Sequence, residues 1–293
     1  SEIAQLYREP YAGVQSDSAR RFYHIPRPER KHHVVAVHRP DPRVKPPLGA
    51  EVDWAHPLNK GLQCCLLFNE GAGRPADIAR PGLARNLYPI MWKTRDRGVS
   101  ISHNVFYLDH QIKYPVREVT IVIRVFYHTP NTQNSRSMVR KYSGTANGNY
   151  RLIIDAGDYE GYVTLYATAD GAWVPLTKLP ASGSPRLTIG AWNDVVATYS
   201  PKTGGKIYIN GRLVPSSVIG PRGELYQNAI DPIMIGGGDT PCYDSDFLAI
   251  YDRELSPAEI AWLYEEPYAG IDCQPWRIFS AERYFPRRKQ QLD

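Results

Sequence analysis

The chain has few cysteines and lacks the patterns that mark secretion, membrane insertion and common catalytic chemistry. Only four of its 293 residues are cysteine, and no Cys-x-x-Cys pair indicates a zinc site. No Asn-x-Ser/Thr sequon, no N-terminal signal peptide and no apolar run near the roughly 20 residues of a membrane helix is found. Serine-hydrolase, zinc-protease and phosphate-loop motifs are also missing. We therefore expect a protein with no membrane contact and no cofactor, made in a reducing cytoplasm.

The cysteines do not form an evident disulfide framework. Cys64 and Cys65 stand side by side in an apolar run, where successive side chains of a strand point to opposite faces. They are poorly placed to bond each other, so we expect buried free thiols. The other two are Cys242 and Cys273.

Charge and composition favour a globular β-protein. A net charge of +5 is too small to indicate nucleic acid by itself. The 25 prolines and 20 tyrosines suit many short strands and frequent turns, and 293 residues suffice for one large sandwich with an appendage.

Residues 186–214 predict strands joined by tight turns, because β-branched and aromatic residues alternate with polar ones. Asn210-Gly211 is a two-residue signal for a type I′ hairpin, with Ile207 and Ile209 on one face and Tyr208 on the other. An alternating set before the turn is predicted to contain Trp192, Val195, Ala197 and Tyr199.

These residues carry a resemblance to the laminin G-like, concanavalin A-like jelly-roll family. The matching residues are Gly190, Trp192, Tyr208, Asn210, Gly211, Ile235 to Gly238 and Leu255 to Ile260. Residues 57–73 resemble the first core strand of the same domains. The resemblance implies an all-β, two-sheet jelly-roll sandwich, a fold that serves lectins, glycosidases, adhesion modules and virion proteins.

Further strands follow from the same alternation. Residues 118–128 predict the clearest core strand, and residues 137–143 and 149–157 predict a neighbouring pair. Asp170-Gly171 predicts another hairpin, whereas residues 76–98 are interpreted as rich in loops. About twelve strands are expected, enough for two packed sheets. The inward set of the core strand is Val119, Ile121, Ile123 and Val125.

Residues 1–14 nearly repeat residues 258–271, with 10 of 14 positions identical. In the second copy, Ser256 is the expected N-cap of a helix, Pro257 its first residue and Glu259 its capping-box acid. The inward stripe is expected to contain Ile260 and either Leu263 or Tyr264; its counterparts in the first copy are Ile3, Leu6 and Tyr7. Either the first copy is the helix of a preceding domain, or a duplicated motif docks on an equivalent site in a neighbour.

Residues 15–50 predict an extended, proline-rich basic arm. Residues 33–39 could add to a sheet as an edge strand. The arm is interpreted either as a tie to a neighbouring protein or as a strap on its own sandwich; nucleic acid is not expected, since no recognition fold is evident. Candidate partner contacts in the arm are Arg20, Arg21, Phe22, Tyr23, Arg27, Val35 and Val37.

Sites for chemistry are few. Glycosidases of this fold carry Glu-x-Asp-x-x-Glu on one strand, and the nearest group, at positions 155, 158 and 160, falls in a predicted turn, so no enzyme activity is expected. Asp239, Asp244 and Asp246 are calcium candidates in a loop between late strands, although turn formation explains the same residues. Glycan stacking is considered at Tyr159, Tyr162 and Trp173, with core packing as the alternative.

The predicted organisation is a short helix at 1–14, an arm at 15–50, a sandwich at 51–271, and a strand with a basic tail at 272–293. The C-terminal pattern resembles laminin G-like proteins of tailed-phage structural modules. That resemblance implies a non-enzymatic virion protein, specifically a capsid decoration or cement protein bound to the major capsid protein and to copies of itself. The alternative is a carbohydrate-binding module, as a tail-fibre accessory or a lectin.

Overall fold

A computed structural model describes residues 41–80, 84–86, 91–95, 98–102, 106–108, 117–128, 136–141, 150–154, 161–169, 172–175, 186–220, 223–225, 233–236 and 243–272. All of them belong to the unit that spans Arg39–Asp293. Within this described part the chain forms seventeen strands, more than the twelve expected, and their pairings are antiparallel. The predicted all-β sandwich is confirmed.

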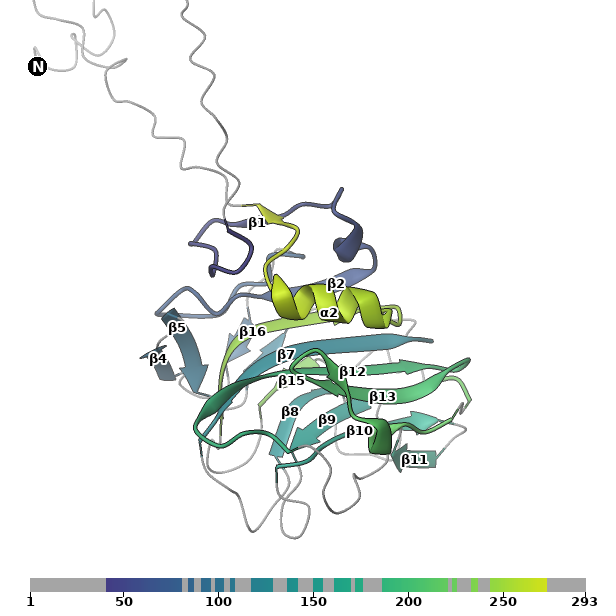
Figure 1. Ribbon diagram of the computed structural model, residues 1–293. Helices are drawn as coiled ribbons and strands as arrows, with labels where there is room; N and C mark the ends of the chain where they lie inside the picture. The colour runs from purple at the N-terminus through teal and green to yellow at the C-terminus, as the bar shows by residue number, and fades with distance from the viewer. Residues whose placement is uncertain are drawn as a thin grey trace, which may run out of the picture. The chain divides into compact units, whose positions relative to one another are not determined.

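The larger sheet has eight strands, in the order β14-β13-β12-β7-β16-β5-β4, with β2 also paired to β16. At its centre, β7 is antiparallel to both β12 and β16. Figure 1 shows these long strands side by side beneath the helix α2. The bounds are β2 Leu62–Leu66, β4 Met91–Arg95, β5 Gly98–Ser102, β7 Val119–Tyr127, β12 Ala191–Ser200, β13 Gly204–Ile209, β14 Arg212–Leu213 and β16 Tyr243–Tyr251.

The second sheet has seven strands, in the order β11-β10-β9-β8-β15-β6-β3. The predicted neighbours at 137–143 and 149–157 pair as β8 and β9, and β10 pairs with β11 around positions 170–171. Figure 1 shows β8, β9 and β10 in the layer beyond β7, β12 and β13. The bounds are β3 Ala84–Asn86, β6 Phe106–Leu108, β8 Arg136–Lys141, β9 Tyr150–Ile154, β10 Val163–Ala169, β11 Ala172–Pro175 and β15 Ile233–Ile235.

The main core fills the space between the two sheets. The predicted inward set of β7 is fully buried there, because side chains two residues apart share a face. Cys64 lies in this core and Cys65 on the opposite face of β2, both as free thiols, as predicted. Full burial of each aliphatic side chain contributes about 1.5–3 kcal/mol.

The Asn210-Gly211 hairpin is confirmed. Ile209 pairs with Arg212 across the turn, and φ is +51° at Asn210 and +74° at Gly211, the signs that a type I′ turn requires. Trp192 was assigned to the wrong face. It is out of phase with Val195, so it lies outside the core, edge-on to Phe126 with ring centroids 5.6 Å apart.

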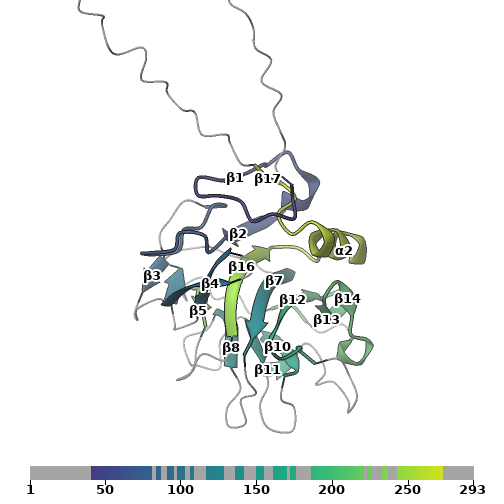
Figure 2. The same cartoon turned by 60° about the vertical axis from the view of Figure 1, so that its left-hand side comes forward.

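A second apolar layer covers the outer face of the eight-stranded sheet. It lies beneath α2 (Pro257–Glu265), the 3₁₀ helix η1 (Pro57–Asn59), and the short sheet of β1 (Glu51–Val52) and β17 (Ile271–Asp272). A further 3₁₀ turn, η3 (Pro215–Ser217), follows β14. Figure 2 shows β1, β17 and α2 grouped on one side of β16. Buried members of this layer include Val122, Val196, Tyr208, Ala249, Ile260 and Leu263.

The helix α2 begins as predicted. Ser256 accepts a hydrogen bond from the Glu259 backbone, and the Glu259 carboxylate accepts one from the Ser256 backbone in return, a complete capping box. Partial burial opposes ionisation of Glu259, but hydrogen bonds from Arg253 and Ser256 outweigh it and lower its pKa to about 2. Of the two candidates for the inward stripe, Leu263 is buried and Tyr264 is exposed.

The structure corrects the prediction for residues 76–98 and chooses between the two interpretations for residues 41–50. Residues 76–98, interpreted as rich in loops, contain β3 and β4. The described end of the arm, residues 41–50, packs on the sandwich as a strap: Pro42 O accepts a hydrogen bond from Tyr268 N at 3.0 Å, and Lys45 Nζ donates to Phe68 O at 3.0 Å. No helix among the described residues is long and apolar enough to cross a membrane.

Candidate functional site

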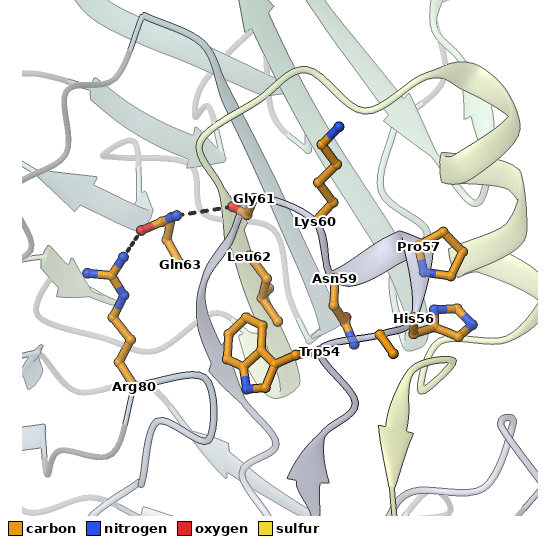
Figure 3. A pocket seen from close by; sticks show the side chains of 10 residues that line it. Trp54, His56, Pro57, Asn59, Lys60, Gly61, Leu62, Gln63 and Arg80 are labelled. Atoms are coloured by element: carbon orange, nitrogen blue, oxygen red, sulfur yellow. Dashed lines mark hydrogen bonds between the residues drawn. The ribbon is translucent and has the colours of Figure 1, made fainter.

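A pocket of about 630 Å³ is formed by the segment between β1 and β2, the first residues of β2, and Arg80. This volume lies within the range of small-molecule sites. We call it the Trp54 pocket, and Figure 3 shows its lining. It is lined by Trp54, Ala55, His56, Pro57, Asn59, Lys60, Gly61, Leu62, Gln63 and Arg80.

The wall of the pocket is held by hydrogen bonds from the buried side-chain amide of Asn59 to backbone carbonyls. Asn59 donates through Nδ2 to Asp53 O at 2.8 Å and to Gly270 O at 2.7 Å. The Asp53 backbone N–H also donates to Gly270 O, at 2.8 Å. These bonds tie η1 to the chain just before β17, so the pocket has a preorganised wall.

A polar network forms another side of the pocket. Gln63 accepts a hydrogen bond from Arg80 and donates to Asp252 Oδ2 at 2.6 Å. Burial raises the pKa of Asp252, and the positive charges of Arg80 and Arg253 act in the opposite direction. Figure 3 shows the Gln63–Arg80 pair on one side of the Trp54 ring, with Asn59 and His56 on the other.

Trp54 is 58% exposed, whereas Leu62, the other large apolar residue of the lining, is buried. His56 instead packs against α2, with its ring centroid 5.1 Å from that of Trp262. Trp262 is further held by a hydrogen bond from Nε1 to Glu266 Oε2 at 2.9 Å. Trp54 is therefore the aromatic face that a ligand in this pocket would meet first.

The lining contains no aspartate or glutamate. Glycoside hydrolysis by the usual route needs two carboxyl groups flanking the scissile bond, so this lining lacks that pair. Its two amides donate their hydrogen bonds within the protein, whereas the imidazole of His56, the ammonium of Lys60 and the guanidinium of Arg80 can donate to hydroxyl or carboxylate oxygens of a ligand. With the indole, this set is suited to binding.

A second described pocket, of about 670 Å³, has a different character. It is lined by Arg117, Glu118, Pro201, Lys202, Glu224 and Asp252. Arg117 Nε and Glu224 Oε1 lie 3.3 Å apart there, both largely exposed. Without an aromatic face, it offers less to an organic ligand than the Trp54 pocket does.

The predicted calcium loop is wrong for two of its three residues. Asp244 and Asp246 lie buried in β16, because they face cations from neighbouring elements. Asp244 Oδ1 is 3.2 Å from Lys93 Nζ and 2.9 Å from His128 Nε2. Asp246 Oδ2 is 3.5 Å from Arg124 Nη1. Asp239 lies outside the described residues, within which no group of three or more histidines, cysteines or acids is placed to hold a metal ion.

Of the three predicted glycan residues, the structure describes the side chain of Tyr162 alone. Tyr162 is buried beneath Arg186, whose guanidinium carbon is 4.7 Å from the ring centroid, so it cannot stack on a sugar. Trp173 occupies β11 opposite Thr168, and Tyr159 and positions 155, 158 and 160 lie outside the described residues. The predicted partner contacts also lie outside them: Ile3, Leu6, Tyr7, Arg20, Arg21, Phe22, Tyr23, Arg27, Val35 and Val37.

Sequence reasoning missed Trp54 and Asn59. The available signal was a tryptophan between Asp53 and Pro57, residues that favour turns, since an aromatic side chain in a turn is often exposed. Asn59 had no such signal, because its partner Gly270 is 211 residues away.

Comparison with known proteins identifies the fold of the central part of the chain. A laminin G-like family model, described as the concanavalin A-like lectin/glucanases superfamily, matches residues 118–261. The residues that line the Trp54 pocket all precede the matched residues in the sequence. No curated protein sequence gives a significant match.

Solved structures share the fold at low identity. The binding domain of Paraclostridial Mosquitocidal Protein 1 has a TM-score of 0.54 at 13% identity, over 71% of this chain and 52% of that one. Botulinum neurotoxin type C, whose cell entry depends on two ganglioside molecules, has 0.50 at 12%, over 71% and 51%. Trypanosoma rangeli sialidase has 0.47 at 15%, over 70% and 32%. The chain thus spans about half or less of their lengths, and the likeness to the first two shows the fold alone.

Proposed function

Because this chain carries a laminin G-like domain of the concanavalin A-like superfamily, we propose that it is a non-catalytic carbohydrate-binding protein whose sugar site is the Trp54 pocket. The observation that carries the proposal is an exposed indole beside the cationic donors Lys60 and Arg80, with no carboxylate in the lining. A sugar ring presents an apolar face and a rim of hydroxyls. Trp54 can meet the face while the donors meet the rim.

The charge of the pocket favours an acidic sugar. Lys60 and Arg80 are both exposed at the lining. A guanidinium matches the two oxygens of a carboxylate, and an ammonium adds attraction without fixed geometry. We therefore propose that acidic oligosaccharides bind more tightly than neutral ones of the same length.

Replacing Trp54 with alanine is expected to weaken oligosaccharide binding at least tenfold, because the stacking surface is lost. The full chain would be screened against neutral and acidic oligosaccharides on an array, and the best ligand measured by isothermal titration calorimetry. Arg80→Ala is expected to reduce the preference for acidic over neutral ligands.

Tyr264→Ala is the matched control for this prediction. Tyr264 is 46% exposed, as an aromatic residue outside the pocket lining, so its removal should leave binding unchanged. An array without any bound oligosaccharide, or equal affinities for wild type and Trp54→Ala, would contradict the proposed site.

A second candidate role is that of a virion structural protein. The sequence features that support it are the basic, proline-rich residues 15–40 and the repeated segment 1–14, which suit contacts to other subunits. In this role the protein would decorate a tailed-phage capsid, with the major capsid protein and its own copies as partners. It would be made in the host cytoplasm and located in the virion.

This role predicts a fixed copy number in purified particles. Quantitative peptide mass spectrometry should give a ratio to the major capsid protein near one or a simple fraction such as one third. Removing residues 1–40 should abolish incorporation while leaving sugar binding intact. The deletion must stop there, because residues 41–50 pack on the sandwich. A few copies per particle would indicate a tail protein, and absence from particles would exclude the role.

A further inference from the structure

Residues 258–271, which we name the closing segment, cover part of the outer face of the eight-stranded sheet. We name the surface that this segment contacts the seat, which includes the neighbouring residues Asp53, His56 and Asn59. The apolar side chains of the seat include Val122, Val196, Tyr208, Phe247 and Ala249. The buried positions of the closing segment are Ile260, Leu263, Pro267, Tyr268, Ala269 and Ile271. Figure 1 shows α2 lying across the strands of this sheet.

Polar contacts fix the second half of the closing segment on the seat. Arg124 Nη1 donates a hydrogen bond to the Tyr268 hydroxyl at 3.1 Å, and the Tyr268 ring stands edge-on to Phe247 with centroids 5.7 Å apart. Gly270 O accepts hydrogen bonds from Asn59 Nδ2 and Asp53 N. Recognition therefore extends past the helix, through the Glu-Pro-Tyr-Ala-Gly sequence.

Residues 1–14 repeat the face of the closing segment that packs on the seat. At the six buried positions the first copy has Ile3, Leu6, Pro10, Tyr11, Ala12 and Val14. Five of these are identical to the second copy, and the sixth replaces Ile271 with valine. The identity thus covers nearly the whole buried face.

The other differences between the copies all fall on exposed positions. Ser1 stands for Ala258, Gln5 for Trp262 and Arg8 for Glu265, and each of the three positions is exposed in the described copy. A segment constrained only to form a helix would vary on both faces, since helix propensity does not distinguish them. The pattern instead matches a constraint from the seat.

Gly270 gives an independent indication of the same constraint. Its φ is +79°, and a Cβ at this position would lie 2.5 Å from Asn59 Nδ2, so the seat itself requires glycine. The first copy has Gly13 at this position.

From this correspondence we propose that residues 1–14 are a second closing segment, which docks on the seat of another copy of the chain. Each chain then has one seat and two segments that fit it. The N-terminal segment of one molecule competes with the C-terminal segment of the next. Such exchange links molecules without any new surface, because the docked segment reuses contacts that the sandwich already makes.

Weakening the chain's own closing segment should favour the exchange. A fluorescein-labelled peptide of residues 1–14 would be titrated against the full-length Leu263→Ala variant and against wild type, with fluorescence anisotropy as the readout. Binding at least tenfold tighter to the variant is expected. A peptide with Leu6→Ala should bind at least tenfold more weakly, whereas Gln5→Ala, at a position that differs between the copies, should bind unchanged. Equal binding by all three peptides would overturn the proposal.

Disulfide trapping tests the exchange in a chain whose closing segment keeps Leu263. Val52 and Ile271 face each other in the antiparallel pair of β1 and β17, where opposite Cα atoms lie about 4.5–5.5 Å apart, so Val52→Cys with Ile271→Cys should bond within one molecule and serves as the positive control. The test pair is Val52→Cys with Val14→Cys, with Cys242 and Cys273 replaced by serine in both proteins.

The proposal predicts a disulfide-linked dimer of the test pair on a non-reducing gel, reduced at least fivefold by adding Leu6→Ala. A bond within one molecule would overturn docking between copies. No bond, with the positive control formed, would overturn docking on the seat.

Discussion

Replacing Arg124 with methionine is expected to lower the free energy of unfolding by about 3 kcal/mol or more. The side chain of Arg124 is only 2% exposed. Its Nε donates to Asp194 Oδ1 at 2.7 Å, and its Nη1 lies 3.5 Å from Asp246 Oδ2. Burial opposes the charge of Arg124, but these two carboxylates raise its pKa well above the usual range.

The expected loss arises from the carboxylates that remain. Asp246 is 1% exposed, so without the guanidinium its charge keeps its desolvation cost and loses a favourable partner. Lys45 lies near the same cluster; burial lowers its pKa to about 8, an effect that Asp246 opposes and Arg124 adds to. The variant also loses the hydrogen bond to the Tyr268 hydroxyl, and with it one contact of the closing segment.

Urea denaturation of wild type and variant at neutral pH measures this effect. Arg124→Met combined with Asp246→Leu is the control, because it removes a buried carboxylate together with its cation. The double variant should be more stable than Arg124→Met alone. A loss under about 1 kcal/mol for the single variant would show that the cluster contributes little.

Replacing Gly270 with alanine is expected to lower the free energy of unfolding by about 3 kcal/mol and to weaken ligand binding in the Trp54 pocket. An L-residue at the φ of +79° costs about 1–2 kcal/mol in backbone strain. The new Cβ would also lie 2.5 Å from Asn59 Nδ2 and 2.8 Å from His56 Nδ1. Asn59 is 4% exposed and cannot move into solvent, so its bonds to Asp53 O and Gly270 O would be strained, at about 1 kcal/mol each.

Gly190→Ala is the matched control for strain alone. Gly190 has a φ of +71°, but a Cβ there meets nothing within 4 Å. This variant should lose only the strain of about 1–2 kcal/mol and keep its ligand affinity. Denaturant melts and calorimetric titration of both variants provide the comparison. Equal losses would mean that the contact with Asn59 and His56 adds nothing.

The sequence alone determined the local features whose causes lie within a few residues. The alternation in β7 predicted its buried face because the side-chain period of a strand is two. Asn210-Gly211 predicted its turn because both positions need a positive φ, and Ser256 with Glu259 predicted the start of α2 because the capping box is local. The family resemblance indicated the sandwich for the same reason, since it rested on these local patterns.

Only the tertiary structure decided features whose partners are distant in the chain. Asp244 and Asp246 resembled loop residues, yet Lys93 and Arg124 hold them in β16. Tyr162 was considered as a residue for stacking on a sugar, but in the structure Arg186 covers its ring.

The Trp54 pocket is the clearest example of a feature whose contacts join residues far apart in the sequence. Asn59 binds Gly270 O across 211 residues, and that closure gives the pocket its wall. No local pattern encodes it, because the closing segment must first pack on the sheet. Burial of its apolar face supplies the free energy that brings these two parts of the chain together.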